Sequence, residues 1–75
     1  MNAPAECRIL TALLLQPMDI RTIAQCLSIQ PMTARHRVAY LRSTREVTVD
    51  TAGSGRATTY KLTRKGESWA RELIA

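Results

Sequence analysis

The sequence predicts one small α+β domain, residues 1–75, in which short helices are followed by a β-hairpin and a last helix. Three observations carry this prediction. Apolar residues recur at helical spacing through most of the first half of the chain. The period changes near residue 47, where apolar and polar residues begin to alternate as in a half-buried strand. A chain of 75 residues can enclose only one hydrophobic core.

Two helical patterns joined by a short turn occupy the stretch from Asp19 to Arg42. Asp19 suits the start of the first pattern, because its carboxylate accepts backbone N–H bonds and complements the positive helix end. Residues 28–30 form the turn, and Pro31 fits the first position of the second helix, which we expect to span Pro31–Ser43. The predicted core positions are Ile20, Ile23, Ala24 and Leu27, then Ala34, Val38 and Leu41.

A preceding helix and a following hairpin complete the predicted order of elements. The helix runs from about Ala5 to Gln16, where Pro17 stops it, and its inward residues are Cys7, Leu10, Leu13 and Leu14. Two strands within 46–62 flank a glycine-rich turn at 52–55. A last helix over 63–75 begins at Thr63, a suitable cap. The aromatic residues Tyr40, Tyr60 and Trp69 are expected to be structural.

Positive charge is concentrated in one part of the chain. The net charge is +5, and residues 33–66 hold eight of the eleven Lys and Arg but two of the six Asp and Glu. Such clustering fits a polyanionic partner, with a basic surface facing solvent as the alternative of equal weight. A short helix, a tight turn and a basic second helix are an arrangement that can enter a DNA major groove. This pattern favours a polyanionic partner over a basic surface that merely faces solvent.

Other chemistries find little support in the sequence. Cys7 and Cys26 fall on apolar helical faces, where we expect reduced core residues, and with His36 they make no zinc-binding spacing. No catalytic acid pair, nucleophile set or phosphate-cradling glycine loop is present, so we expect neither an enzyme nor a cofactor. No apolar run is long enough to cross a membrane and no secretion signal is visible, which predicts a cytoplasmic protein.

Three segments carry motifs in a characteristic order. Ile23–Ile29 reads I-A-x-x-L-x-I, Thr33–Leu41 is a basic helix with an inward Leu near its end, and Tyr60–Gly66 reads Y-x-L-T-x-x-G. Together they resemble the winged helix-turn-helix family of small bacterial and phage transcriptional regulators. The resemblance implies that Pro31–Ser43 is the recognition helix and that the hairpin is the wing. One position departs from the pattern: many members carry Gly where this chain has Arg45, so the usual glycine exit from the helix is not expected.

The face of the 31–43 helix opposite its buried positions is the candidate base-reading surface; it carries Pro31, Met32, Arg35, His36 and Ala39. Arg35 is the strongest candidate, because a guanidinium can bond both N7 and O6 of guanine. His36 reads a base or a phosphate, or is a solvated helix residue. Met32 and Ala39 contact a thymine methyl, or are simply surface residues.

Phosphate contacts are expected around this face and on the hairpin. Thr33, near the helix start, can donate its hydroxyl to a phosphate. The other candidates for contacts with the DNA backbone are Arg37, Arg42, Lys61, Arg64 and Lys65. The resemblance further implies that Ser54 and Arg56, at the wing tip, approach a minor groove, whose negative potential favours Arg. An exposed hairpin tip carrying one charge is the alternative for these two residues.

We therefore expect a sequence-specific binder of double-stranded DNA that regulates transcription. A homodimer through the first and last helices would add affinity, using apolar residues such as Leu15, Leu73 and Ile74. The alternative is a winged-helix module that binds a protein, for example a phage or plasmid inhibitor of a host factor. An acidic protein partner would fit the positive charge as well as DNA does.

Overall fold

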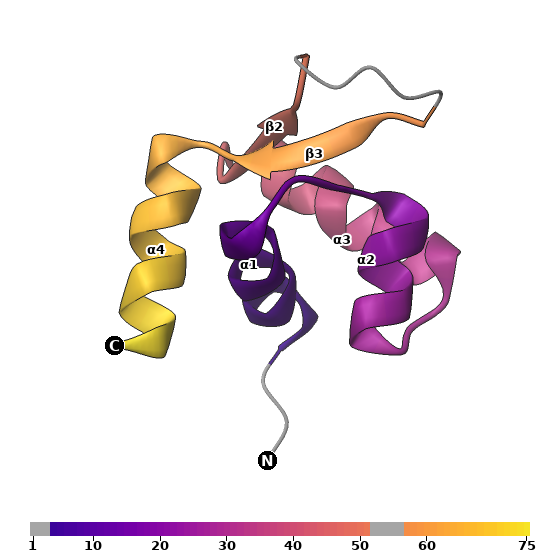
Figure 1. Cartoon of the computed structure of the whole chain (residues 1–75), viewed down its shortest axis with the longest axis horizontal. Coiled ribbons are helices and arrows are strands. Elements are labelled where there is room, and N and C mark those ends of the chain that lie inside the picture. Colours follow the sequence, from indigo (N-terminus) through magenta and orange to yellow (C-terminus); the bar gives the residue numbers. More distant parts are fainter. Residues whose placement is uncertain (1–3, 52–56) are drawn as a thin grey trace.

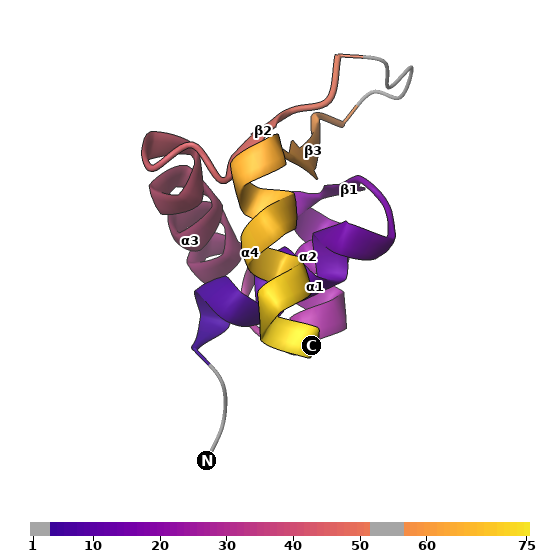
Figure 2. The same ribbon diagram turned by 90° about the vertical axis from the view of Figure 1, so that its left-hand side faces the viewer.

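The computed structural model describes residues 4–51 and 57–75. In these residues four helices lie beneath a small sheet, with α4 alongside α1 and with α2 and α3 on the other side of α1 (Figures 1 and 2). In chain order the elements are α1 (Ala5–Leu15), β1 (Met18–Asp19), α2 (Ile20–Leu27), α3 (Pro31–Ser43), β2 (Val47–Val49), β3 (Thr59–Leu62) and α4 (Arg64–Ile74). The predicted α+β class and the order of helices and hairpin are confirmed.

The sheet contains a strand that the sequence pattern did not reveal. Its order is β1-β3-β2, and both neighbouring pairs are antiparallel. Met18 lies opposite Tyr60 in one pair, and Val47 lies opposite Leu62 in the other. The expectation of a two-stranded hairpin was therefore incomplete. A strand of two residues is too short to show alternation, so only its pairing partner identifies it.

The hydrophobic core is formed mainly where the helical patterns predicted it. The buried side chains include Ile23, Ala24 and Leu27 of α2, and Ala34, Val38 and Leu41 of α3. Leu10 and Leu13 of α1 are also buried, as predicted, but Ile9 and Met18 were not anticipated. These side chains fix which face of α3 is turned inward and therefore which face is available to a partner.

Four side chains are more exposed than core residues would be. Cys26 is exposed and Cys7 is only half-buried, because both lie beside rather than within the buried stripes of their helices. Tyr40 is 58% exposed and Trp69 is 39% exposed, so neither is a core aromatic. Tyr60, by contrast, is half-buried and packs against the core.

Side-chain caps start α2 and α4 at the predicted residues. The Thr22 backbone N–H donates to Oδ1 of Asp19 at 2.8 Å. The Gly66 backbone N–H donates to the hydroxyl of Thr63 at 3.1 Å. Each bond satisfies a donor that the first turn of a helix otherwise leaves unpaired.

Each helix of the helix-turn-helix is followed by a left-handed residue that is not glycine. Ser28 follows α2 with φ 57°, and Arg45 follows α3 with φ 70°. At the end of α3 the Glu46 N–H donates to the Leu41 carbonyl at 2.9 Å, and the Arg45 N–H donates to the Arg42 carbonyl at 3.1 Å. This is the Schellman arrangement that normally ends on glycine. The helix exit is thus not made by glycine, as expected, but Arg45 adopts the backbone conformation that glycine would supply.

Candidate nucleic-acid interface

The outward face of α3 presents the residues predicted to read bases. Ala34, Val38 and Leu41 are buried, so the opposite side of α3 is turned outward. The exposed set includes Pro31, Met32, Thr33, Arg35, His36 and Ala39. Met32 is 60% exposed, so its side chain is accessible on this face.

An open groove lies where the first turns of α2 and α3 meet the hairpin. It is lined by Asp19, Ile20, Arg21, Pro31, Arg35, Ala57, Thr58 and Tyr60. Three segments far apart in the sequence thus contribute to one surface, at the side of the molecule where Figure 1 shows the start of α2 and the hairpin. The groove places Arg35, from the predicted reading helix, on the same surface as the hairpin.

Arg21 is the groove residue that the sequence analysis missed. It follows the Asp19 cap in the first turn of α2, is exposed, and has no ion pair or side-chain hydrogen bond in the described residues. The residues outside 33–66 hold three bases and four acids, so the sequence analysis left Arg21 in a part of the chain with a slight net negative charge. The signal that identifies it is its position, because the first helix of a helix-turn-helix crosses the DNA backbone.

One carboxylate shares the groove with the two arginines. Hydrogen bonds from the Thr22 backbone N–H and side chain, with a smaller contribution from the positive charge of Arg21, lower the pKa of Asp19 below its usual value of 3.8. Asp19 is therefore charged at neutral pH, but Oδ1 is occupied as the cap of α2. The carboxylate caps α2. Because Arg21 and Arg35 carry two positive charges against the one negative charge of Asp19, the groove keeps a net positive charge.

Several predicted phosphate ligands are engaged within the protein. Arg37 Nη1 lies 3.1 Å from Oε2 of Glu6 on α1. Lys65 Nζ lies 3.3 Å from Oε2 of the buried Glu46, and Lys61 Nζ lies 4.0 Å from Oδ1 of Asp50. These pairs reduce the charge that each cation offers to a partner, although exposed pairs exchange readily with solvent.

Arg42 connects α3 to the hairpin. Its guanidinium carbon lies 5.9 Å from the centre of the Tyr60 ring, within range of a cation–π contact. Arg42 and Arg35 are seven residues apart, two helical turns, so they share the side of α3 that faces the hairpin. Arg37 lies on the other side of α3, as its ion pair with Glu6 on α1 requires.

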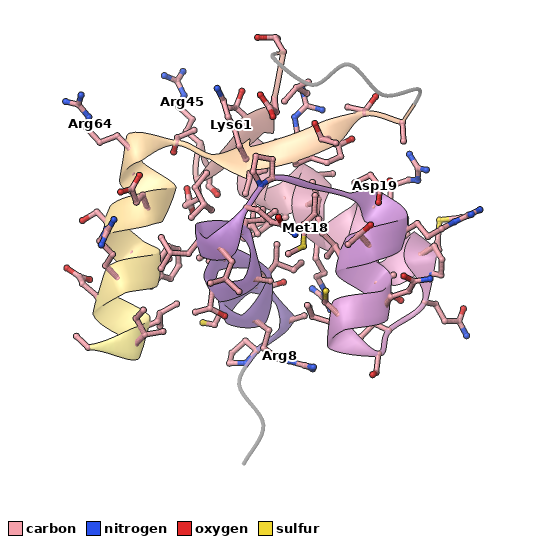
Figure 3. The ribbon with its side chains drawn as sticks, viewed as in Figure 1. Arg8, Met18, Asp19, Arg45, Lys61 and Arg64 are labelled. Carbon is pink, nitrogen blue, oxygen red and sulfur yellow. The ribbon has the colours of Figure 1, made fainter. Side chains whose placement is uncertain are left out.

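Four cations with different surroundings gather at the opposite end of α3 from the groove. Arg45 follows α3, Lys61 lies on β3, and Arg64 and Lys65 begin α4. Figure 3 shows Arg64 and Arg45 at the upper left and Lys61 between them and Asp19, two residues along β3 from Thr59, which pairs with Asp19 in the sheet. The structure thus does not bring Lys61, Arg64 and Lys65 to the groove that contains Arg35.

The predicted contacts of Ser54 and Arg56 fall outside the described residues. Ala57 and Thr58, which follow directly, line the groove and were not among the predicted contacts. In the part of the chain that the structure describes, no cluster of His, Cys, Asp and Glu could hold a metal ion. No helix in those ranges has the length and hydropathy needed to cross a membrane.

Solved structures share this fold, whereas no protein-family model and no curated protein sequence matches the chain. Lactococcus lactis ZitR in complex with DNA is 22% identical, with a TM-score of 0.82 over 99% of this chain and 52% of the other. The adhesin competence repressor AdcR of Streptococcus pyogenes is 22% identical, with a TM-score of 0.85 over 96% of this chain and 55% of the other. The transcriptional regulator Tm0710 of Thermotoga maritima is 25% identical, with a TM-score of 0.82 over 96% of this chain and 51% of the other.

The chain spans about half the length of these solved structures. At this level of identity the match shows the fold, a winged helix-turn-helix in which α2 and α3 are the two helices of the motif and β2 and β3 form the hairpin.

Proposed function

We propose that the chain binds double-stranded DNA sequence-specifically and regulates transcription. In this proposal α3 enters the major groove and the hairpin, residues 46–62, contacts flanking DNA. The role is one of binding rather than catalysis. Support comes from the charge of the chain, from the winged helix-turn-helix fold and from the named functions of its structural neighbours, one of which was solved in complex with DNA.

The groove between α2, α3 and the hairpin is the observation that carries the proposal. Its two arginines, Arg21 and Arg35, have no ion-pair partner in the described residues, whereas Arg37, Lys61 and Lys65 are paired. A guanidinium without an ion pair or side-chain hydrogen bond in the protein can donate to a phosphate or a base edge. Two of the unpaired cations are therefore found where the two helices of the motif and the hairpin converge, whereas Arg45 and Arg64 lie at the other end of α3.

Each groove residue has a specific role in the proposal. Arg35 makes bidentate bonds to a guanine, and His36, Met32 and Ala39, with Pro31, form the remainder of the base-contacting face. Arg21 and the hydroxyl of Thr33 contact phosphates beside the first turns of their helices.

Residues outside the groove have supporting roles. Arg42 keeps its contact with Tyr60 while its guanidinium faces the DNA backbone. Ser54 and Arg56 extend from the hairpin to the adjacent minor groove. Arg37 could contact a phosphate only after leaving Glu6, so we assign it a secondary role.

A homodimer would complete the DNA-binding unit. One module buries only about 600–1,000 Å² on DNA, so two copies on adjacent half-sites gain affinity and specificity. α1 and α4 carry exposed apolar side chains suited to such contact: Leu15 is 83% exposed, Leu73 40% and Ile74 63%.

Selection from a pool of random duplexes tests the proposed function. The full chain should enrich a short motif, and gel shift should show that the motif binds more tightly than a shuffled duplex of equal composition. Footprinting should place protection in a major groove, with weaker protection in the flanking minor groove. Failure to enrich any motif, with equal binding to every duplex, would refute sequence-specific recognition.

A further inference from the structure

A basic cluster at the C-terminal end of α3 lies outside the groove, and three of its four members have no role in the proposed contact with DNA. It consists of Arg45, Lys61, Arg64 and Lys65, which come from three separate parts of the chain. The Thr63 hydroxyl donates to the Arg45 carbonyl and Lys65 Nζ donates to the Thr44 carbonyl at 2.8 Å, so the end of α3 is tied to the start of α4. The cluster is therefore held together by the fold.

The four cations differ in how far they are committed to the protein. Lys65 pairs with the buried Glu46, and Lys61 lies near Asp50. Glu46 also accepts a bond from the Thr44 hydroxyl at 2.7 Å, so its carboxylate belongs to the junction between α3 and α4. Arg45 and Arg64 are exposed and have no side-chain hydrogen bond or ion pair within the described residues. These two guanidinium groups are the part of the cluster available to a partner.

The Arg45 side chain makes no hydrogen bond or ion pair in the described residues that would explain an arginine at this left-handed position. Its φ of 70° lies in the left-handed region, in which glycine incurs no steric cost and a side chain does. The helix exit needs only the backbone of this residue, whose N–H bonds to the Arg42 carbonyl. Strained residues persist where a site uses them, and this one places an unpaired cation beside another, Arg64.

The cluster and the DNA-binding groove lie at opposite ends of α3. A helix of 13 residues is roughly 20 Å long, so the cluster lies about that far from the first turn of α3, where the groove begins. Figure 3 shows Arg45 and Arg64 extending from the side of the molecule opposite Asp19. A partner that binds Arg45 and Arg64 therefore contacts residues other than those that line the groove.

We propose that Arg45 and Arg64 form a docking site for an acidic segment of another protein. Planar guanidinium forks match carboxylates in bidentate geometry, and Lys61 adds positive potential beside them. Carboxylates rather than the phosphates of DNA are the proposed ligands because neither Arg45 nor Arg64 lines the groove. The site would let a DNA-bound chain recruit, or be controlled by, an acidic partner, and its existence does not depend on the DNA-binding role.

Two double variants with the same loss of charge test the inference. Arg45→Gly with Arg64→Gln removes the cluster arginines, and Arg21→Gln with Arg35→Gln removes those of the groove. Binding of the full chain to a fluorescein-labelled oligoglutamate peptide and to a labelled duplex is measured by anisotropy. The cluster variant should lose about tenfold in affinity for the peptide and keep its affinity for the duplex. The groove variant should show the reverse.

Glycine at position 45 keeps the helix exit, so the cluster variant should melt at or above the temperature of the wild type. Equal loss of peptide binding in both variants would show attraction by net charge alone and overturn the docking site. Loss of duplex binding in the cluster variant would make Arg45 and Arg64 DNA backbone contacts and also overturn it. A wild type that binds the peptide but no duplex would reject the proposed DNA-binding function while leaving the docking site standing.

Discussion

Gly66 lies directly against the backbone carbonyl of Glu46. A Cβ atom placed on Gly66 would stand 2.0 Å from that oxygen, far inside contact distance. The same carbonyl accepts the Thr63 N–H at 3.0 Å, so the first turn of α4 packs onto the residue that links α3 to β2. The glycine of the Y-x-L-T-x-x-G run thus permits the close approach that orients α4 relative to α3 and the hairpin.

Substitution of this glycine should destabilise the domain. Alanine normally stabilises a helix relative to glycine by about 0.5–1 kcal/mol, but here the methyl group meets backbone that must shift. We expect Gly66→Ala to lower the free energy of unfolding in urea by about 1–3 kcal/mol. Ser68→Ala, at an exposed position of α4, is the control and should change stability little. A more stable Gly66→Ala would mean that α4 is placed differently.

Truncation of a buried leucine tests the inward face of α3. Leu41 has no exposed surface and packs in the core with Ile23 and Val38. Leu41→Ala should therefore cost about 2–5 kcal/mol of unfolding free energy through lost burial and a residual cavity. Ala39→Ser, on the exposed face, is the comparison. If both variants melt like the wild type, α3 has another register and the base-reading face moves with it.

The charge of Asp19 should make the domain more stable above acidic pH. Because bonds from Thr22 lower the pKa of Asp19, its stabilising contribution is fully present above its unfolded value, near 3.8, and is lost as pH falls through the lower folded value. Asp19→Asn retains a capping side chain but removes this titration. Urea unfolding should show wild type more stable at neutral pH and the difference shrinking below pH 3.8. A constant difference at all pH values would show that the charge does not matter.

Substitution of Arg35 or Arg37 should distinguish a sequence-dependent base contact from a general effect of charge on the surface of α3. Arg35→Ala should cost about 1–3 kcal/mol on the selected duplex and little on shuffled DNA, because a bidentate base contact is sequence-dependent. Arg37→Ala should have a small effect on both duplexes, since this side chain is paired with Glu6 on the other side of α3. Gel-shift titrations measure both. Equal losses on the two duplexes from Arg35→Ala would identify it as a backbone contact.

Local signals in the sequence were sufficient for most of the fold. The bounds of α3 followed from Pro31 at its first position and from the spacing of Ala34, Val38 and Leu41. β1 could not be predicted, because two residues carry no period and its pairing with β3 joins distant parts of the chain.

The candidate interface was predictable only in part. Helical periodicity correctly identified the exposed face of α3, including Arg35. The pairing of Arg37, Lys61 and Lys65 with acids elsewhere in the fold required the structure, as did the location of Arg21 in the groove. The conformation of Arg45 was also hidden, because a non-glycine residue in a left-handed position shows no sequence signal.

The salt dependence of binding to a selected duplex, measured beside a shuffled one, tests the central claim most directly. If the groove and its surroundings neutralise about four to six phosphates per chain, log affinity should fall against log salt with a slope of about −4 to −5. The selected duplex should remain more tightly bound at each salt concentration, because base contacts release few counterions. A slope near zero, or identical affinities for the two duplexes, would contradict sequence-specific DNA binding by this surface.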